Sequence, residues 1–273
     1  MWTLCRFAVT GTCLWLMVTA DATASAPPSD TQSNIVTFSA SDSKFEGPDQ
    51  LPAGQTTVRL RNRGKEPHQL RFLKLEEGKS PADLAAALKS GNGVVPAWAK
   101  HMGGPNGADV GKTSEATLYL EPGTYVVICG IPGKHHLRNI PQKALRVMDT
   151  ASPPAEFKGN FHMAMFEYEF VVVQPLRKGR HSFYVINRGS QVHQATFVRL
   201  DAGASASDVL TALSQGKPSP LPGKLIGGMS GLEPGRDGTF TAELTPGHYA
   251  IMCLFGNGES HATKGMVTYF TID

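Results

Sequence analysis

The chain has little charge and no long apolar run, and each shortage excludes a class of protein. Charged residues make up 18% of the 273 positions, and the formal net charge is only +3. No run of Lys and Arg is dense enough for a nucleic-acid surface, so we expect no nucleic-acid partner. No apolar segment is long enough to cross a bilayer of ~30 Å as a helix, so we expect no membrane span.

One short apolar stretch at the N-terminus indicates export. Arg6 precedes the apolar residues 7–20, and Ala24-Ser25-Ala26 then gives the small-residue pattern of a cleavage site. We therefore predict a signal peptide over residues 1–26 and a periplasmic or secreted protein.

Glycine and proline, in contrast, are plentiful, with 29 and 19 residues. This balance is typical of short strands joined by many turns. Apolar and polar residues alternate around Val58 and again around Phe183, as in half-buried strands. One short helix is expected after Ser80 and another after Ser205, where Ser-x-x-Asp provides a capping pattern. The sequence therefore predicts an all-β fold with two short helices.

A set of landmarks occurs twice along the chain, at an offset of 124 or 125 residues. The paired landmarks are Asn62-Arg63-Gly64 with Asn187-Arg188-Gly189, His68-Gln69 with His193-Gln194, Gly103-Gly104 with Gly227-Gly228, Pro122-Gly123 with Pro246-Gly247, and Cys129 with Cys253. A constant offset over so many landmarks indicates duplication of a whole domain. We place the two domains at 34–149 and 157–273, with a linker around residues 151–155, and expect each to be an antiparallel β-sandwich with its own core.

Only two cysteines, Cys129 and Cys253, remain after removal of the signal peptide. An exported protein usually pairs such cysteines. Equivalent positions in two separately packed domains should lie far apart, whereas a disulfide needs Cα atoms within ~7 Å. A thiol exposed to an oxidising compartment is a liability unless it is buried or binds a ligand. We therefore expect no disulfide and look for a metal.

The second copy contains a full set of candidate metal ligands: His193, Cys253, His261 and Met266. Two imidazoles, one thiolate and a weak axial thioether form the trigonal type 1 copper site, which suits both copper(I) and copper(II). The cysteine ends a predicted strand, and the second histidine and the methionine follow on one loop. This arrangement predicts copper binding in the second copy.

These residues give the chain a resemblance to the cupredoxins plastocyanin and azurin. The segment from Asn187 to His193 resembles the Asn-containing turn before their first ligand, and Cys253, His261 and Met266 resemble their C-terminal ligand loop. The resemblance covers most of both copies and implies two tandem Greek-key β-sandwiches that bind copper. The loop departs from the family, since seven residues separate Cys253 from His261 instead of two to four.

The first copy keeps a weaker ligand set. It has His68, Cys129 and a second histidine at His135 or His136, of which we assign His136. Ala144 is matched to the axial methionine of the second copy, and Gln142 is the candidate for an axial oxygen ligand, a variation that the resemblance to cupredoxins allows. A three-ligand site and a degenerate copy that supports folding remain alternatives.

The function expected from this resemblance is electron transfer to or from a redox protein partner. Copper oxidases and nitrite reductases, which also repeat this domain, add histidines next to the ligand cysteine. Here the cysteines are flanked by Ile128, Gly130, Met252 and Leu254, and there is no His-x-His pair, so we expect no enzyme. The alternatives are a metal-free binding or scaffold module, and a copper store or carrier without a redox role.

Overall fold

The computed structural model describes residues 34–131, 142–150, 156–215, 221–256 and 259–273. Within these residues the fold is mostly β, with seventeen strands and two short helices, as the sequence predicted. The predicted signal peptide and the linker at 151–155 lie outside the described residues. Neither described helix is long and apolar enough to cross a membrane.

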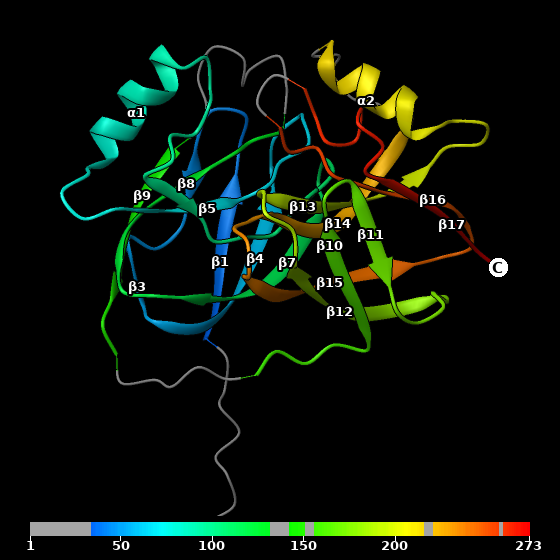
Figure 1. Ribbon diagram of the computed structural model, residues 1–273, viewed down its shortest axis with the longest axis horizontal. Helices are drawn as coiled ribbons and strands as arrows, with labels where there is room; N and C mark the ends of the chain where they lie inside the picture. Colours follow the sequence, from blue (N-terminus) through cyan, green and yellow to red (C-terminus); the bar gives the residue numbers. More distant parts are fainter. Residues whose placement is uncertain (1–33, 132–141, 151–155, 216–220, 257–258) are drawn as a thin grey trace, which may run out of the picture. The chain divides into compact units, whose positions relative to one another are not determined.

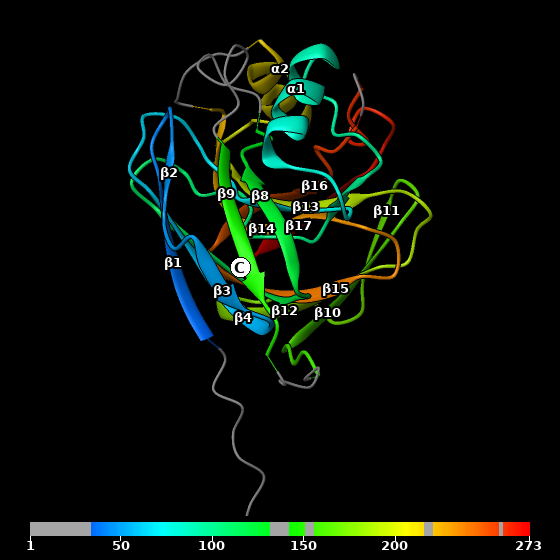
Figure 2. The same cartoon turned by 90° about the vertical axis from the view of Figure 1, so that its left-hand side faces the viewer.

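The first half (residues 34–149) contains nine strands and one helix in the part that the structure describes. These are β1 (Asn34–Ala40), β2 (Phe45–Glu46), β3 (Gln50–Pro52), β4 (Gly54–Asn62), β5 (Arg71–Leu75), α1 (Pro81–Ser90), β6 (Ala99–His101), β7 (Thr113–Leu120), β8 (Gly123–Ile128) and β9 (Gln142–Met148). Strands β3, β9, β8, β5 and β6 form a five-stranded sheet in that order. Figure 2 shows β1, β3, β4 and β9 on one side of the molecule.

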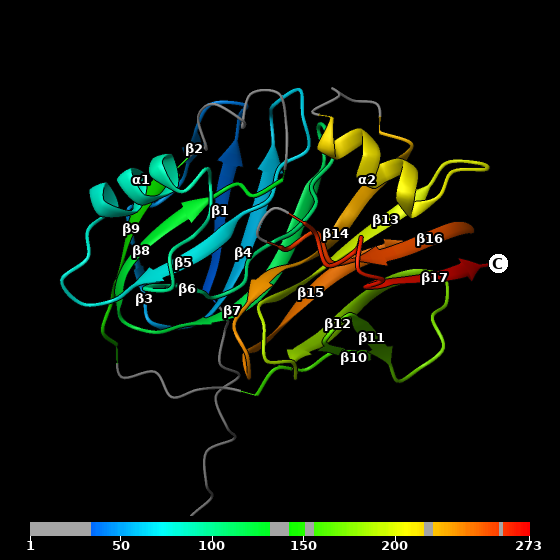
Figure 3. The ribbon, with the colours of Figure 1, turned by 45° about the horizontal axis from the view of Figure 1, so that its top comes forward.

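The second half (residues 157–273) has eight described strands and one helix. These are β10 (Phe161–Phe166), β11 (Glu169–Val172), β12 (Gly179–Asn187), β13 (His193–Leu200), α2 (Ala206–Ser214), β14 (Gly223–Leu232), β15 (Asp237–Leu244), β16 (Gly247–Met252) and β17 (Val267–Ile272). Strands β14, β13, β16 and β17 form a four-stranded sheet, which Figure 3 shows beside α2.

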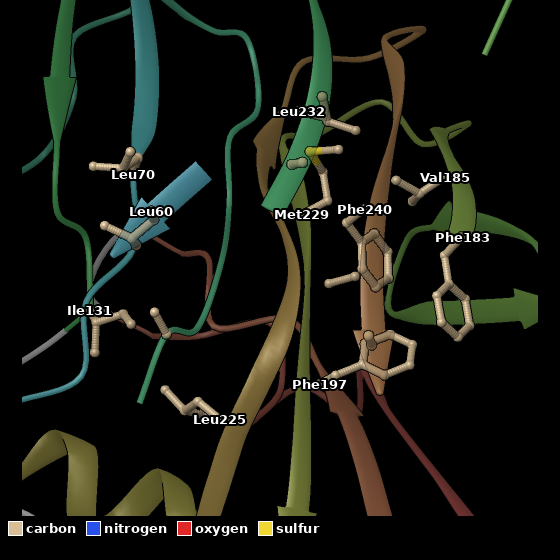
Figure 4. Close-up of a cluster of buried hydrophobic side chains, with 14 of the residues drawn as sticks. Leu60, Leu70, Ile131, Phe183, Val185, Phe197, Leu225, Met229, Leu232 and Phe240 are labelled. Atoms are coloured by element: carbon tan, nitrogen blue, oxygen red, sulfur yellow. The ribbon is translucent and has the colours of Figure 1, made fainter. Parts of the chain in front are cut away.

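The third sheet joins the two halves. Its eight strands run in the order β11-β10-β12-β15-β7-β4-β1-β2, and the halves meet where β15 pairs with β7 (Figure 1). Buried side chains of both halves, such as Leu60 and Phe197, belong to one hydrophobic cluster (Figure 4). This differs from the expectation that each half buries a core of its own, because a continuous sheet places the two apolar faces in contact.

The strands are not all antiparallel, which corrects the predicted sheet type. β1 pairs with β4 in parallel, β3 pairs with β9 in parallel and β10 pairs with β12 in parallel. Parallel neighbours require a crossover, and β3 provides one, because it joins the five-stranded sheet between β1 and β4. The residue alternation in the sequence carries no information on this crossover.

Both predicted helix starts are confirmed. Ser80 caps α1 and Ser205 caps α2, and each serine forms a reciprocal capping box with the aspartate three residues later. Pro81 occupies the first turn of α1, where its missing N–H leaves no unsatisfied donor. The same capping pattern thus defines the corresponding helix in each half.

The repeated Gly-Gly pairs lie where the two halves meet. Here Asn106 Nδ2 donates to the Ala195 carbonyl at 3.1 Å, and Ser230 Oγ donates to the Leu70 carbonyl at 2.8 Å. Gly228 has φ +133, and a Cβ at this position would overlap the Ala195 carbonyl. Gly104, in the other half, has φ +147 and would meet the Leu70 carbonyl in the same way. Glycine is therefore needed at both positions.

We expect Gly228→Ala to lower the free energy of unfolding by more than 2 kcal/mol, because a left-handed backbone costs about 1–2 kcal/mol and the steric overlap adds to it. The matched control is Gly235→Ala, since Gly235 has φ +78 but no atom within 4 Å of the added carbon. Urea unfolding of the two variants measures the difference. Equal losses would contradict the close approach inferred at Gly228.

Candidate metal centre

Three candidate ligands of the second half converge on one buried point. His193 begins β13, Cys253 directly follows β16, and His261 lies in the turn before β17. Their donor atoms lie within 4.8 Å of one another, and all three residues are buried. The His261 Nδ1 atom is 3.1 Å from His193 Nδ1 and 3.6 Å from Cys253 Sγ, and His193 Nδ1 is 4.0 Å from the same sulfur. Two imidazole nitrogens and one sulfur thus face a common centre.

The turn that precedes His193 is held by the Asn187 side chain. Its Nδ2 donates to the Gln191 carbonyl at 2.7 Å and to the Leu232 carbonyl at 2.8 Å, and its Oδ1 accepts the Gly189 N–H at 3.0 Å. The buried Asn187 amide thus provides hydrogen-bond partners for two backbone carbonyls and one backbone N–H. These bonds fix the approach of the chain to His193 and explain why an asparagine stands six residues before this histidine.

The Cys253 sulfur is enclosed and hydrogen-bonded by the backbone. Burial raises the pKa of the Cys253 thiol to about 11, while N–H groups of Gln194 and Phe255 act in the opposite direction. The Gln194 N–H lies 3.4 Å from the sulfur. In the metal-free protein the thiol is therefore protonated at neutral pH. When a metal displaces the proton, the two N–H groups would stabilise the resulting thiolate by hydrogen bonding.

The two histidines are suited to bind a metal as neutral imidazoles. Burial is the largest effect on each ring, and it lowers the pKa of both His193 and His261. The positive charges of protonated His193 and of Lys264 lower the pKa of His261 further. Unprotonated imidazoles and a thiolate together form the donor set that copper prefers.

The long loop between Cys253 and His261 is closed by backbone hydrogen bonds. The His261 N–H donates to the Phe255 carbonyl at 2.7 Å, and the Ala262 N–H donates to the Cys253 carbonyl at 2.9 Å. Glycine is needed at position 256, because a Cβ there would overlap the Glu259 carbonyl, which the chain approaches closely. These hydrogen bonds bring His261 back to the Cys253 end of β16 despite the longer sequence between the two residues.

Met266, the predicted axial ligand, is fully buried. Its N–H donates to the His261 carbonyl at 2.9 Å, and its carbonyl accepts the Cys253 N–H at 3.2 Å. These backbone contacts tie the methionine to both neighbouring ligands. Its assignment as a ligand stays a prediction.

Sequence reasoning missed a carboxylate beside the first ligand of each half. Glu167, in the turn between β10 and β11, has Oε1 3.6 Å from His193 Nε2, which is longer than a hydrogen bond and makes the contact electrostatic. The same carboxylate accepts the Ser190 and Gln191 N–H groups. Asp42 lies 3.3 Å from His68 Nε2 in the first half. The repeat offset links Asp42 to Glu167, and this signal in the sequence could have identified both.

The first-half ligands are only partly described. His68 is buried, and Cys129 directly follows β8 and is also buried. Both candidate second histidines, His135 and His136, lie outside the described residues. A three-ligand metal site and a degenerate copy without metal therefore both stay predictions for the first half.

The alignment of the predicted axial position is corrected by strand register. Gln142 is exposed and pairs with Ile128, just as Val267 pairs with Met252 in the second half. Ala144 pairs with Val126, which makes it the counterpart of Tyr269. Ala144 thus does not match Met266, and Gln142 occupies the position one residue after it. The sequence does not give this register, because the segments between the cysteine and the last strand differ in length between the two halves.

The two cysteines share an electrostatic neighbour. Cys129 and Cys253 are both buried and form no disulfide, as expected. Each of them nevertheless interacts electrostatically with the guanidinium of Arg71, which is also buried. The cysteines therefore lie closer together than two separately packed domains would place them.

Comparisons with known proteins were made for the sequence and for the structure. No family model matches the chain, and no curated protein matches it. Auracyanin A, a "blue" copper protein of Chloroflexus aurantiacus, is a similar solved structure with 26% identity and a TM-score of 0.29, over 42% of this chain and 100% of that one.

Two larger proteins are similar over most of this chain. The copper-containing nitrite reductase of Thermus scotoductus SA-01 has 12% identity and a TM-score of 0.25, over 88% of this chain and 62% of that one. The blue copper oxidase of Nitrosomonas europaea has 15% identity and a TM-score of 0.25, over 89% of this chain and 86% of that one.

The structure contains the His–Cys–His cluster that the resemblance to cupredoxins predicted, and a blue copper protein is among the similar solved structures. The cluster is compatible with a type 1 copper site. The expectation that the chain is not an enzyme is wrong, because similar structures that cover most of it are named as a nitrite reductase and an oxidase. That expectation rested on the absence of histidines next to the two cysteines and of any His-x-His pair, and short-range spacing does not exclude ligands that folding brings together.

We expect Glu167→Ala to weaken copper binding by about 10- to 100-fold, the usual effect of removing a group that orients a ligand histidine. The lost carboxylate would free the His193 ring and two backbone N–H groups of the turn. Chelator competition measures the dissociation constant. Asp42→Ala, the matched change in the first half, should leave the constant unchanged, and an equal loss in both variants would refute a local role for Glu167.

Copper(I) affinity should rise about tenfold per pH unit between pH 7 and 9, because binding displaces the Cys253 proton, whose pKa is raised to about 11. The histidines add no slope in this range, since their pKa values are lowered and both are already neutral. Anaerobic competition with a chelator of known pH dependence provides the measurement. Cys253→Ser should abolish the slope, and a flat wild-type profile would show that this thiol is not deprotonated on binding.

Proposed function

We propose that this chain is an exported electron-transfer protein with a type 1 copper centre in its second half. His193, Cys253 and His261 hold the metal, and Met266 is the weak axial ligand. The observation that carries this proposal is the convergence of two Nδ1 atoms and one sulfur within 4.8 Å at a buried point. A bound copper ion would supply a one-electron couple between copper(I) and copper(II).

The residues around this point keep the ligand atoms in place whatever the oxidation state. Cys253 is fixed by the end of β16, and His261 and Met266 are tied to it by backbone hydrogen bonds. Little rearrangement of these residues is needed between the two states, which favours fast electron transfer. Here preorganisation comes from the end of a strand and from a loop that backbone hydrogen bonds hold against it.

Exchange with a redox protein partner would use the His261 side of the centre. His261 is 4% exposed and lines a cavity of about 1280 Å³ together with Leu254 and Phe255. His193, in contrast, has no exposed surface. The His261 edge is therefore the ligand edge that a partner can approach most closely.

The proposal includes a domain organisation and a location. The halves 34–149 and 157–273 are two cupredoxin-like Greek-key domains of a periplasmic or secreted protein, after removal of residues 1–26. The recurrence of the capping boxes, the asparagine turns and the Asp42 and Glu167 contacts supports the duplication. In the first half, His68, Cys129, His136 and Gln142 form the candidate second ligand set.

The test is a visible absorption spectrum of the copper(II)-loaded protein, with Cys253→Ser and Cys129→Ser as a matched pair. We expect an intense thiolate-to-copper band near the red end of the spectrum that is lost only in Cys253→Ser. A second band lost in Cys129→Ser would add a first-half centre. A folded, copper-treated protein without any such band would overturn the electron-transfer proposal and favour a scaffold or a copper store.

A further inference from the structure

A buried arginine of the first half lies against the metal centre of the second half. Arg71 begins β5 and is 8% exposed. Its Nη2 donates to Gln194 Oε1 at 3.1 Å, and its guanidinium carbon lies 5.1 Å from the centre of the Phe255 ring. Gln194 and Phe255 are the two residues whose backbone N–H groups donate to the Cys253 sulfur. Arg71 therefore contacts both residues that surround this sulfur.

The first half makes room for this side chain with a glycine. A Cβ at Gly130 would lie 2.7 Å from the Arg71 guanidinium carbon and 2.8 Å from the Gln69 amide. At the corresponding positions of the second half the sizes are reversed, with Thr196 in place of the arginine and Leu254 in place of the glycine. The guanidinium is thus a feature of one half only, directed toward the ligands of the other.

The charge of Arg71 is not neutralised by a carboxylate in the described part of the chain. Its polar and electrostatic neighbours include Gln194, Gln69, His101 and the two cysteines Cys129 and Cys253, and the Phe255 ring adds a cation–π contact. Burial lowers the pKa of Arg71 to about 10, which leaves it protonated at neutral pH. A buried cation without an ion-pair partner is costly, so its retention calls for a role near the two thiols.

We propose that Arg71 is a positioning residue that sets the reduction potential of the copper centre in the second half. The inference rests on the proposed function. Arg71 acts in two ways: its hydrogen bond holds the Gln194 peptide against the Cys253 sulfur, and its buried charge acts on the centre through a medium of low polarity.

The direction of the effect follows from charge. Reduction removes one positive charge from the metal and its ligands, and a fixed cation nearby therefore favours the reduced state. Because Arg71 and Cys253 are both buried, solvent and salt screen this interaction little. Arg71 thus raises the potential, and the N–H donors to the sulfur act in the same direction by withdrawing charge from the thiolate.

The test is a redox titration of the full-length, copper-loaded protein with Arg71→Met and Arg71→Lys. Arg71→Met should shift the copper(II)/copper(I) equilibrium at least tenfold toward copper(II), which is a fall of about 59 mV for one electron. Arg71→Lys keeps the charge and should recover more than half of this shift. The visible band and the copper electron-spin resonance should stay as in the wild type, because no ligand is altered.

Two further variants keep the test decisive. Arg236→Met removes a cation that also joins the halves, through Glu121 and the Tyr119 carbonyl, but that does not touch the cysteines, and it should leave the potential unchanged. If Arg71→Met does not fold, Gly130→Ala takes its place, because the added methyl group displaces the guanidinium without removing the charge from the chain. Gly130→Ala should also lower the potential.

The outcomes separate this inference from the proposed function. A blue copper band with an unchanged potential in Arg71→Met, or an equal fall in Arg236→Met, would overturn the role of Arg71 and leave the copper centre standing. An equal fall in Arg71→Met and Arg71→Lys would exclude the charge as the cause. Absence of the band in the wild-type protein would instead overturn the proposed function itself.

Discussion

The hydrogen bond from the Gln194 N–H to the Cys253 sulfur is the contact on which the site depends. It exists because β13 and β16 pair in a register that sets Thr196 opposite Met252, so that the start of one strand meets the end of the other. His193 is the residue before this donor and Cys253 is its acceptor. A shift of one residue in this pairing would turn either ligand to the opposite face of the sheet. The β-ladder therefore specifies the centre before the loop contributes its ligands.

The sequence predicted this part of the site because its ligands are close together along the chain or belong to repeated motifs. Strand alternation placed Cys253 at a strand end, and the spacing of His261 and Met266 followed from one loop. Glu167 and Arg71 were beyond such reasoning, since their roles come from contacts with residues far along the chain. The sheet that joins the halves was missed for the same reason. Alternation identifies a buried face, but it does not identify the surface that covers it.

The repeated glycines show how the two halves depend on each other. Gly104 and Gly228 let the chain approach a carbonyl that also accepts a side-chain hydrogen bond from the other half, Ser230 in one case and Asn106 in the other. The contact is therefore reciprocal, and it uses buried polar groups whose loss would leave unsatisfied carbonyls. Such buried hydrogen bonds have strict geometry, so they hold the two halves in one arrangement, whereas contacts between surface charges would allow many relative orientations.

A fixed junction is what allows the halves to differ in chemistry. A buried guanidinium acts most strongly on a neighbouring sulfur when its position is fixed and little water reaches it, and Arg71 is 8% exposed and held by Gln194 and Phe255 of the second half. Gly130 leaves room for the Arg71 guanidinium, and the matching residue of the second half is the larger Leu254. The buried cation therefore comes from the first half and lies beside the sulfur of the second. The two halves differ at these two positions, and the reversed residue sizes place the guanidinium of the first half beside the residues that surround the Cys253 sulfur. The electrostatics of the second-half site are therefore a property of the joined chain, and 157–273 alone would lack the cation.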